Sequence, residues 1–396
     1  MSYSFQLSKP LVDYGRAIRE WSASEARPYA RQADLDHRPP SNWADILDTC
    51  PVPLGRIDTA EPDPIPTFDE GYWTSSLVFY ENINYGDIWV HPTLGGGIGH
   101  LVVESMGTPE QIEKWYTPVV ERGLPTGFAL TEPHFGSDTS QVSTTATRDG
   151  DNWVLKGSKI YCSGGATSDY VVVFATVDKS LGAKGINAFV VPAGTPGFII
   201  AKENEQKLGI RSWVTSELLF DNCVIPVENQ LGWTADGNAA PRRSGQGGAL
   251  GALANNRPNM AAMCIGLGQA AIDLTTIILA GQKAAFSPQR WRAVEQDLEA
   301  MNFALERGRR MSFRAQYLVD QGKEDRAISA AGKGYAPETV ERVIRRCMQL
   351  LGPEGTSEEL LLEKWYRDVK IMDIFEGSGQ VQRIVVGRTL MGRLVG

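Results

Sequence analysis

The sequence has few cysteines and histidines, and neither type is grouped. The four histidines form no i, i+4 pair and no His-Glu-x-x-His motif, and no two cysteines form a Cys-x-x-Cys pair. This pattern argues against a disulfide framework, a zinc knuckle and a histidine-based metal site. We therefore expect no metal, and unpaired cysteines are typical of a reducing, cytoplasmic location. The cysteines are Cys50, Cys162, Cys223, Cys264 and Cys347.

Long basic runs are also missing, and 39 Lys and Arg against 47 Asp and Glu give a net charge of −8 at pH 7. Nucleic-acid binding through phosphates is therefore disfavoured. The first ten residues lack a basic segment followed by an apolar one, so no secretory signal is expected. One apolar run, Met260 to Gly281, is long enough to span a membrane, but it carries Gln269 and Asp273. A central Asp costs roughly 3 kcal/mol to insert, so we expect a buried core helix and no membrane span.

The 396 residues change pattern twice along the chain. The first part is mainly helical, and Thr108 to Gln111 has the form of a capping box. Short β-prone runs separated by Gly, Asp and Pro turns follow, and helical patterning resumes after a Gly- and Ala-rich linker. Segregated elements of this kind predict an α+β fold. The expected parts are an N-terminal helical domain (1–127), a central antiparallel β domain (128–235), and a linker with a C-terminal helical domain (236–396).

Two common phosphate-binding and nucleophile motifs are not supported. Gly95 to Gly99 contains four glycines, but no Lys-Ser or Lys-Thr pair follows it and no strong strand precedes it. We therefore expect a tight turn or a close backbone contact there instead of a phosphate loop. No Gly-x-Ser-x-Gly elbow is present, which disfavours an α/β-hydrolase nucleophile.

Four blocks of sequence carry a family resemblance: FALTEPHFGSD, LKGSKIYCSGG, KLGIRSWVTSELLFDNCVIP and IFEGSGQVQR. Each block alone is weak, but together, in this order and spacing, they resemble the acyl-CoA dehydrogenase family over roughly residues 75–396. The resemblance implies a C-terminal four-helix bundle and a homotetramer or homodimer. It also implies FAD between the β domain and the C-terminal helices, held in part by a neighbouring subunit.

The resemblance assigns the chemistry to Glu376, with Arg257 as its electrostatic partner. Glu376 would remove the α proton of an acyl-CoA while the flavin accepts the β hydrogen as hydride. The product would be a trans-2-enoyl-CoA, and the electrons would pass to an electron-transferring flavoprotein. A buried carboxylate suits this role because burial raises its pKa toward the operating pH. Without the resemblance, Glu376 is an acid near a helix start, where the helix dipole explains it equally well. Asn256 stands where some branches of the family place the base, and an amide cannot accept the proton.

Further positions are implied by the same resemblance, residue by residue. Tyr161 and Ser163 replace the more usual Trp and Thr, and both keep the type of chemistry: an aromatic ring and a hydroxyl. Gln382 also falls where family members touch FAD. Substrate contacts are implied at Ser137, Arg257, Glu376 and Gly377. The other implied FAD contacts are Phe128, Leu130, Thr131, Ser137, Tyr161, Ser163, Lys283, Phe286, Gln349, Gly352, Ser378 and Gln380.

The C-terminal region also carries predictions that rest on local pattern. Thr356 and Glu359 have the spacing of a capping box for a helix that contains Leu360 to Trp365. A buried stripe is expected along the last helix. Its members are Val381, Ile384, Val385, Leu394 and Val395.

The chain departs from the family at the FAD pyrophosphate and the cross-subunit loop. Lys283 replaces an Arg, which keeps the charge and loses the bidentate fork. Pro353 replaces a Gly, which removes an N–H donor and fixes φ. These two replacements leave open a flavin-poor partner subunit of a mixed oligomer, although the retained Glu376, Tyr161 and Ser163 argue against it. An acyl-CoA oxidase and a dehydrogenase of carrier-protein thioesters stay open as well, because no motif encodes oxygen reactivity or the thiol carrier. The length and type of the acyl group are left open.

Overall fold

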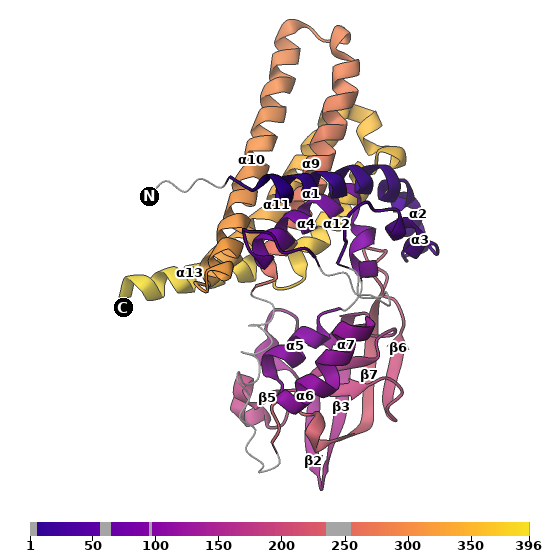
Figure 1. Cartoon of the computed structure of the whole chain (residues 1–396), viewed down its shortest axis with the longest axis vertical. Helices are drawn as coiled ribbons and strands as arrows, with labels where there is room; N and C mark the ends of the chain where they lie inside the picture. The colour runs from indigo at the N-terminus through magenta and orange to yellow at the C-terminus, as the bar shows by residue number, and fades with distance from the viewer. Residues whose placement is uncertain (1–5, 56–64, 95–96, 235–254, 396) are drawn as a thin grey trace.

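A computed structural model describes residues 6–55, 65–94, 97–234 and 255–395, without the side chains of 393–395. The predicted order of helical, β and helical parts is confirmed, and Figure 1 shows most of the helices together above the β-rich part, whereas the helices of residues 99–122 lie beside the strands. The predicted linker with Arg242 and Arg243 lies largely outside the described residues, as do Gly95 and Gly96.

Short helices make up most of the first 122 residues. The predicted capping box is confirmed, because the Thr108 hydroxyl accepts the Gln111 N–H and the Gln111 side chain accepts the Thr108 N–H. The elements are α1 (Lys9–Trp21), η1 (Ser22–Ala26), η2 (Arg27–Tyr29), α2 (Ala30–Asp36), α3 (Trp43–Asp48), α4 (Tyr72–Gly86), η3 (Ile88–Leu94), α5 (Gly99–Met106), α6 (Pro109–Gln111), η4 (Ile112–Tyr116) and α7 (Thr117–Arg122).

The central part is a seven-stranded sheet in the order β1-β4-β2-β3-β7-β6, with β5 also paired to β4. The prediction of an antiparallel domain needs one correction, since β4 pairs in parallel with both β1 and β2. Strand β2 runs in the direction of β1, and β3 runs back antiparallel to it, so that β4 can start at the same end as β1 and pair with it in parallel. The elements are β1 (Thr126–Ala129), η5 (Thr139–Gln141), β2 (Thr145–Asp149), β3 (Asn152–Ser163), β4 (Tyr170–Thr176), η6 (Lys179–Gly185), β5 (Ile186–Pro192), β6 (Phe198–Lys202), β7 (Thr215–Pro226) and η7 (Val227–Asn229).

The C-terminal part is built on three long helices, α9, α10 and α11, which pack on one another. Helix α4 of the N-terminal part also packs on α9 and α10, whereas α13 packs mainly on α11 and extends to one side (Figure 1). The elements are α9 (Arg257–Gly281), η8 (Lys283–Ala285), α10 (Pro288–Asp320), α11 (Arg326–Leu351), η9 (Gly352–Thr356), η10 (Glu358–Leu360), α12 (Leu362–Ile374) and α13 (Gly379–Val395).

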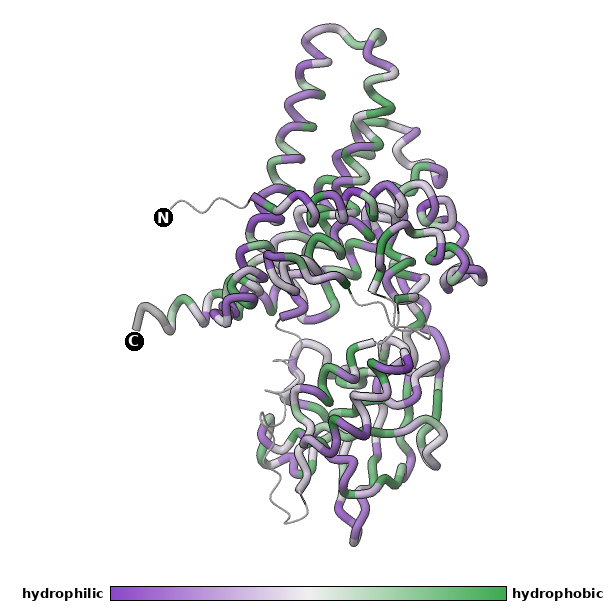
Figure 2. Tube along the Cα trace, viewed as in Figure 1, coloured by the Kyte–Doolittle hydropathy of each residue, from purple (hydrophilic) through white to green (hydrophobic). Residues whose placement is uncertain are grey.

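The apolar residues form one core for the helices and one on each face of the sheet. Figure 2 shows hydrophobic segments in both the helical and the β-rich parts. The helical core joins α1 and α4 to the C-terminal helices, whereas α5 and α7 pack on the sheet. Segment 1–127 therefore contributes to two different cores, and its predicted end falls inside β1. Close backbone contact explains two of the glycines at the start of α5: a Cβ at Gly97 would lie 2.0 Å from the Thr126 carbonyl oxygen, and one at Gly99 would lie 2.4 Å from the Gly127 carbonyl oxygen.

Helix α9 is the apolar run noted in the sequence. Its length and composition would suffice to cross a membrane, but 67% of its most apolar window is buried inside the protein. Met260, Ile265 and Leu267 belong to the helical core. Packing within this protein therefore accounts for the apolar composition of α9.

Two expectations for the C-terminal helices are wrong. Helix α12 begins at Leu362, and Thr356 does not cap it, because the Thr356 hydroxyl donates to the Pro353 carbonyl. Ser357 instead caps the short turn η10. In α13, Ile384 is exposed, and the residue buried in its place is Gln382. The Gln382 amide donates hydrogen bonds to the carbonyl oxygens of Glu376 and Gly377 in the turn between α12 and α13, which explains why this polar residue is buried.

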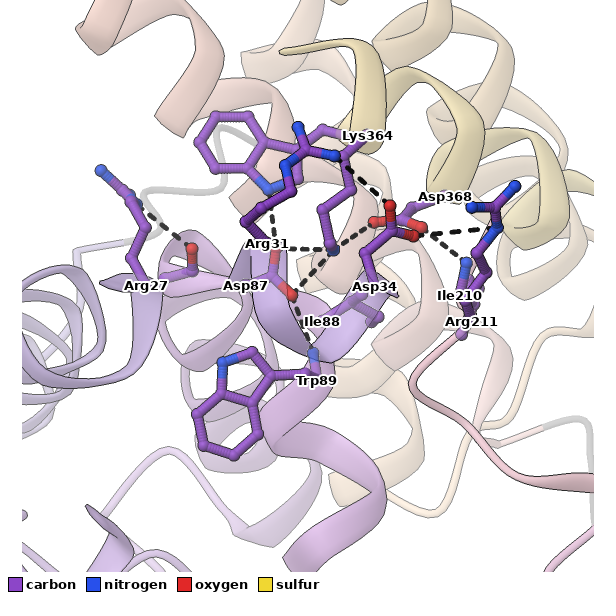
Figure 3. Close-up of polar contacts among 12 residues, drawn as sticks. Arg27, Arg31, Asp34, Asp87, Ile88, Trp89, Ile210, Arg211, Lys364 and Asp368 are labelled. Atoms are coloured by element: carbon purple, nitrogen blue, oxygen red, sulfur yellow. Dashed lines mark hydrogen bonds and ion pairs between the residues drawn. The ribbon is translucent and has the colours of Figure 1, made fainter. Parts of the chain in front are cut away.

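A buried group of charges fixes α12 in the molecule (Figure 3). The Lys364 ammonium donates to Asp87, at 2.8 and 2.9 Å, and to Asp368, at 2.7 Å. Asp368 also accepts the backbone N–H of Ile210 at 2.5 Å, and Asp87 accepts the Trp365 indole N–H at 2.8 Å. Three distant segments are thereby joined: the end of α4, the loop before β7, and α12, which leads directly to residue 376.

Candidate active site

A strained turn between α12 and α13 presents Glu376. Glu376 has a φ of 55° and Gly377 a φ of 90°, so two successive residues adopt left-handed backbone conformations. Gly is favoured at 377 because L side chains rarely adopt a φ of 90°, and a Cβ there would also lie 2.5 Å from the Gln382 Nε2 atom. A left-handed non-glycine residue costs roughly 1–3 kcal/mol and persists only where its surroundings hold it in place.

Two buried side chains hold this turn. The Lys333 ammonium, in α11, donates to the carbonyl oxygens of Asp373 at 3.1 Å and Gly377 at 3.0 Å. The Gln382 amide donates to the carbonyl oxygens of Glu376 at 3.2 Å and Gly377 at 2.9 Å. Burial lowers the pKa of Lys333 to about 8, although nearby acidic groups, including Glu376, oppose the shift. Gln382 therefore has a structural role in this turn, and its expected contact with FAD stays a prediction.

The Glu376 carboxylate has one bonded oxygen and one free oxygen. Its Oε1 accepts a hydrogen bond from the Asn256 amide at 2.9 Å, whereas its Oε2 is buried and accepts none from the residues described. Burial raises the pKa of Glu376, and the Asn256 hydrogen bond with the Lys333 and Arg257 charges opposes this rise. A buried carboxylate with a raised pKa and an unoccupied oxygen can act as a general base.

Arg257 lies beside this carboxylate at the start of α9. Its side chain is buried, and its Nε has no hydrogen-bond partner among the described residues. Burial lowers the pKa of Arg257, and the Glu376 charge opposes that shift. The structure therefore brings together the two residues that the sequence assigned to the chemistry.

Aromatic rings form a wall beside Glu376 that the sequence analysis missed. His91 stacks on Trp213 with ring centroids 4.8 Å apart, and Tyr80 and Phe375 extend the row at 5.2 and 6.1 Å. Burial lowers the pKa of His91 to about 4, so its ring is neutral at neutral pH. These residues come from α4, η3, the loop before β7 and the turn after α12, so no local motif could have identified them.

The predicted flavin contacts of the β domain lie at the end of β1 and at a bulge in β3. The Ile160 N–H donates to the Thr131 carbonyl at 2.9 Å, and the register of β3 against β7 shifts between Lys159 and Cys162. Tyr161, in this bulge, has a φ of 54° and a side chain that is 58% exposed. Ser163, at the end of β3, is also exposed, so the strand presents an aromatic ring and a hydroxyl to the outside.

A buried ion pair shapes the loop after β1. Glu132 and Lys159 are in contact at 2.8 Å, and Lys159 also donates to the Leu130 carbonyl at 3.1 Å. Glu132 further accepts the backbone N–H groups of Ser143 and Thr144 at 2.7 and 2.9 Å. Burial alone would raise the pKa of Glu132, but Lys159 and these donors lower it to about 2. Glu132 belongs to the block that carried the resemblance, and its structural role was missed.

The other predicted contacts vary in exposure. Leu130 is buried and Phe128 half-buried, and both pack in the core on one face of the sheet. Ser137 and Gln380 are exposed. Ser378 caps α13, since its hydroxyl accepts the Val381 N–H at 3.4 Å.

Four predicted cofactor residues lie at the other end of the helical part. Arg257 is the first residue of α9 and Lys283 follows its last turn, so the length of the helix, about 37 Å for 25 residues, separates them. Lys283 lies over the Trp291 ring at 4.8 Å, and Phe286 contacts the same ring. Gln282 donates to Glu354 at 3.4 Å, which brings this turn close to η9. Lys283, Phe286, Gln349 and Gly352 therefore form a second group, remote from Glu376 in one chain.

Comparisons with known proteins identify the family of this chain. Residues 127–223 match the family model "Acyl-CoA dehydrogenase, middle domain", and residues 243–391 match "Acyl-CoA dehydrogenase, C-terminal domain". The mitochondrial short-chain specific acyl-CoA dehydrogenase of Bos taurus is 32% identical over 379 residues, 95% of this chain and 89% of that protein.

Solved structures give the same result. Butyryl-CoA dehydrogenase from Megasphaera elsdenii superposes with a TM-score of 0.82 at 28% identity, covering 98% of this chain and 100% of that one. A chain in the structure described as "Electron transferring flavoprotein of Acidaminococcus fermentans: Towards a mechanism of flavin-based electron bifurcation" also has a TM-score of 0.82 and 28% identity. It covers 98% of this chain and 99% of its own length.

Proposed function

Because this chain belongs to the acyl-CoA dehydrogenase family and is an oxidoreductase acting on acyl-CoA, we propose that it desaturates an acyl-CoA to the trans-2-enoyl-CoA with Glu376 as base. The observation that carries this proposal is the buried Glu376 Oε2, which has no hydrogen-bond partner among the described residues and lies in a turn held by Lys333 and Gln382. Such an oxygen is free to accept the proton α to the thioester carbonyl.

The surrounding residues support proton removal in distinct ways. Arg257 places a positive charge near the carboxylate and stabilises its ionised form. The absence of a side chain at Gly377 lets the thioester approach the backbone, where N–H groups stabilise the enolate-like oxygen that develops as the proton leaves. The rings of Tyr80, His91, Trp213 and Phe375 form an apolar surface near Glu376 that would keep water from the acyl group. The likeness to short-chain and butyryl-CoA dehydrogenases supports a short acyl group.

The residues present fit FAD. Tyr161 offers an exposed aromatic surface in the bulge of β3. The Ser163 hydroxyl lies at the end of the same strand, and the Thr131 hydroxyl follows β1, which is joined to the bulge by the Ile160 hydrogen bond. Bound there, FAD supplies the hydride acceptor that the reaction needs. Ser137, Ser378 and Gln380 would hold its other parts.

We also propose an oligomer, because the second group around Lys283 and Gln349 lies too far from Glu376 to hold the same FAD molecule. A second copy would bring its Lys283 group to the flavin of the first. Exposed apolar side chains on and before α13 support such an assembly: Ile374, Ile384 and Met391 are each more than half exposed. The electron acceptor we propose is an electron-transferring flavoprotein, as the likeness to the Acidaminococcus fermentans structure suggests.

The test of this function is anaerobic bleaching of the flavin absorbance of the purified protein by a panel of acyl-CoAs. The panel contains short, medium, long, branched and cyclic acyl groups. We expect bleaching by short acyl-CoAs first. A yellow protein that no acyl-CoA bleaches would contradict acyl-CoA as the substrate and favour a carrier-protein thioester. Oxygen consumption during turnover would identify an oxidase, and a colourless protein that gains FAD only with a second polypeptide would identify a mixed oligomer.

The pKa of Glu376 predicts the pH dependence of the reaction. The base must be ionised to accept a proton, and burial raises its pKa above the usual value of a glutamate. We therefore expect kcat/KM to fall as the pH is lowered through this raised pKa, and to be constant above it until another group titrates. The acid limb, meaning the fall of kcat/KM at low pH, is measured from a pH profile of kcat/KM with an unactivated substrate. A limb at the ordinary glutamate pKa would contradict the assignment.

A further inference from the structure

Three side-chain amides form a chain of hydrogen bonds that ends on Glu376. The Gln316 amide, in α10, donates to the Asn259 Oδ1 atom at 2.8 Å. Asn259 donates to the Asn256 Oδ1 atom at 3.4 Å, and Asn256 donates to the Glu376 Oε1 atom at 2.9 Å. Gln316 is fully buried and Asn259 nearly so. The chain thus connects α10, across the start of α9, to the carboxylate.

The direction of these bonds is determined from both ends. An ionised carboxylate can only accept, so Asn256 must present its NH2 group to Glu376 and its oxygen to Asn259. At the other end, the Gln316 NH2 group also donates to the Asn255 backbone carbonyl at 3.1 Å, and a carbonyl too can only accept. Asn259 lies between them, so its oxygen faces the Gln316 NH2 group and its NH2 group faces the Asn256 oxygen. Every amide therefore points its NH2 group toward Glu376.

The charged and titratable groups around Glu376 come from four other directions. They are Arg257 of α9, Lys333 of α11, Tyr80 of α4 and Asp373 of α12, and Arg326 acts on Arg257. None of these groups donates a hydrogen bond to either carboxylate oxygen within the described part of the chain, whereas Asn256 donates one to Oε1. The orientation of the carboxylate therefore depends on the amide.

We propose that Gln316, Asn259 and Asn256 form a one-directional amide relay that holds Glu376 by its Oε1 atom and leaves Oε2 to accept the substrate proton. The proposal rests on the proposed function, in which Glu376 is the base. The three amides are positioning residues: they act through Glu376 and do not touch the substrate in this role. Because each bond polarises the next, the relay also favours the ionised form of the carboxylate.

The experiment compares Asn256→Leu and Gln316→Met, which keep volume and remove the donor, by two measurements. The first is an infrared pH titration of the Glu376 carboxyl group in the purified flavoprotein, assigned by subtracting the spectrum of Glu376→Gln. The second is the acid limb of kcat/KM. Loss of the donor removes a bond to the charged form, so we expect Asn256→Leu to raise both apparent pKa values by about one unit. We expect Gln316→Met to raise both by about one third of a unit, because it acts two bonds away.

A matched control is Asn229→Ala, which removes a buried amide that donates one bond to the Val190 carbonyl at 2.8 Å within the β-rich part. It should alter neither titration, even if it lowers stability. Unchanged titrations in Asn256→Leu would overturn the proposal. A shift in Asn256→Leu with none in Gln316→Met would also overturn it, since no relay would then extend beyond Asn256. Because the infrared titration does not depend on turnover, it separates failure of the relay from failure of Glu376 as the base.

Discussion

We expect Glu376→Gln to lower kcat by at least about 100-fold while the protein remains yellow and binds acyl-CoA. Gln has nearly the size of Glu and can still accept the Asn256 hydrogen bond, so the turn should be retained. What disappears is the ability of the buried Oε2 atom to take a proton. Stopped-flow reduction of the flavin by the best acyl-CoA of the panel isolates this step from later electron transfer.

The control for this variant is Glu359→Gln, an exposed glutamate in η10 whose substitution removes one negative charge far from the turn. Its rate of flavin reduction should equal that of the wild type. Near wild-type reduction in Glu376→Gln would place the base elsewhere. Arg257 is not an alternative base, because a guanidinium stays protonated at any pH at which the protein is folded.

The second large effect is on stability, and we expect it from Lys364→Met. Removing the ammonium leaves Asp87 and Asp368 buried without their countercharge, 2.7 to 2.9 Å from where it stood. Removing one partner of a buried ion pair lowers the free energy of unfolding by about 3–5 kcal/mol. Chemical denaturation monitored by Trp fluorescence and circular dichroism measures the change in the free energy of unfolding. Since α12 leads into the Glu376 turn, flavin reduction should slow as well.

Lys370→Met provides a matched control in the same helix. Lys370 is exposed and pairs with Glu341 at 3.2 Å, so its loss should change stability by less than about 1 kcal/mol. Adding Asp368→Asn to Lys364→Met removes one of the two stranded charges and should recover part of the loss. If Lys364→Met and Lys370→Met were equally stable, the buried cluster would not be what fixes α12.

Much of the fold could be predicted from local pattern. The capping box at Thr108 is encoded within four residues, and the apolar composition of α9 already indicated a core helix. The wrong expectations also have physical causes. Ile384 fitted a helical stripe, but α13 packs mainly on α11, so part of its apolar face stays exposed. The parallel pairing of β1 with β4 depends on a long-range crossing that no turn residue records.

The sequence by itself determined the family, because four short motifs in a fixed order are a property of the chain alone, and through the family it predicted Glu376 and Arg257 as the residues of the chemistry. Only the tertiary structure decided what surrounds the carboxylate. Asn256 and Gln316 lie 60 residues apart in sequence, and Lys333 and Trp213 are still farther apart, so no spacing rule connects them. Their effects on Glu376 depend on burial and on contacts of about 3 Å, and both exist only once the helices and the β-rich part have packed together.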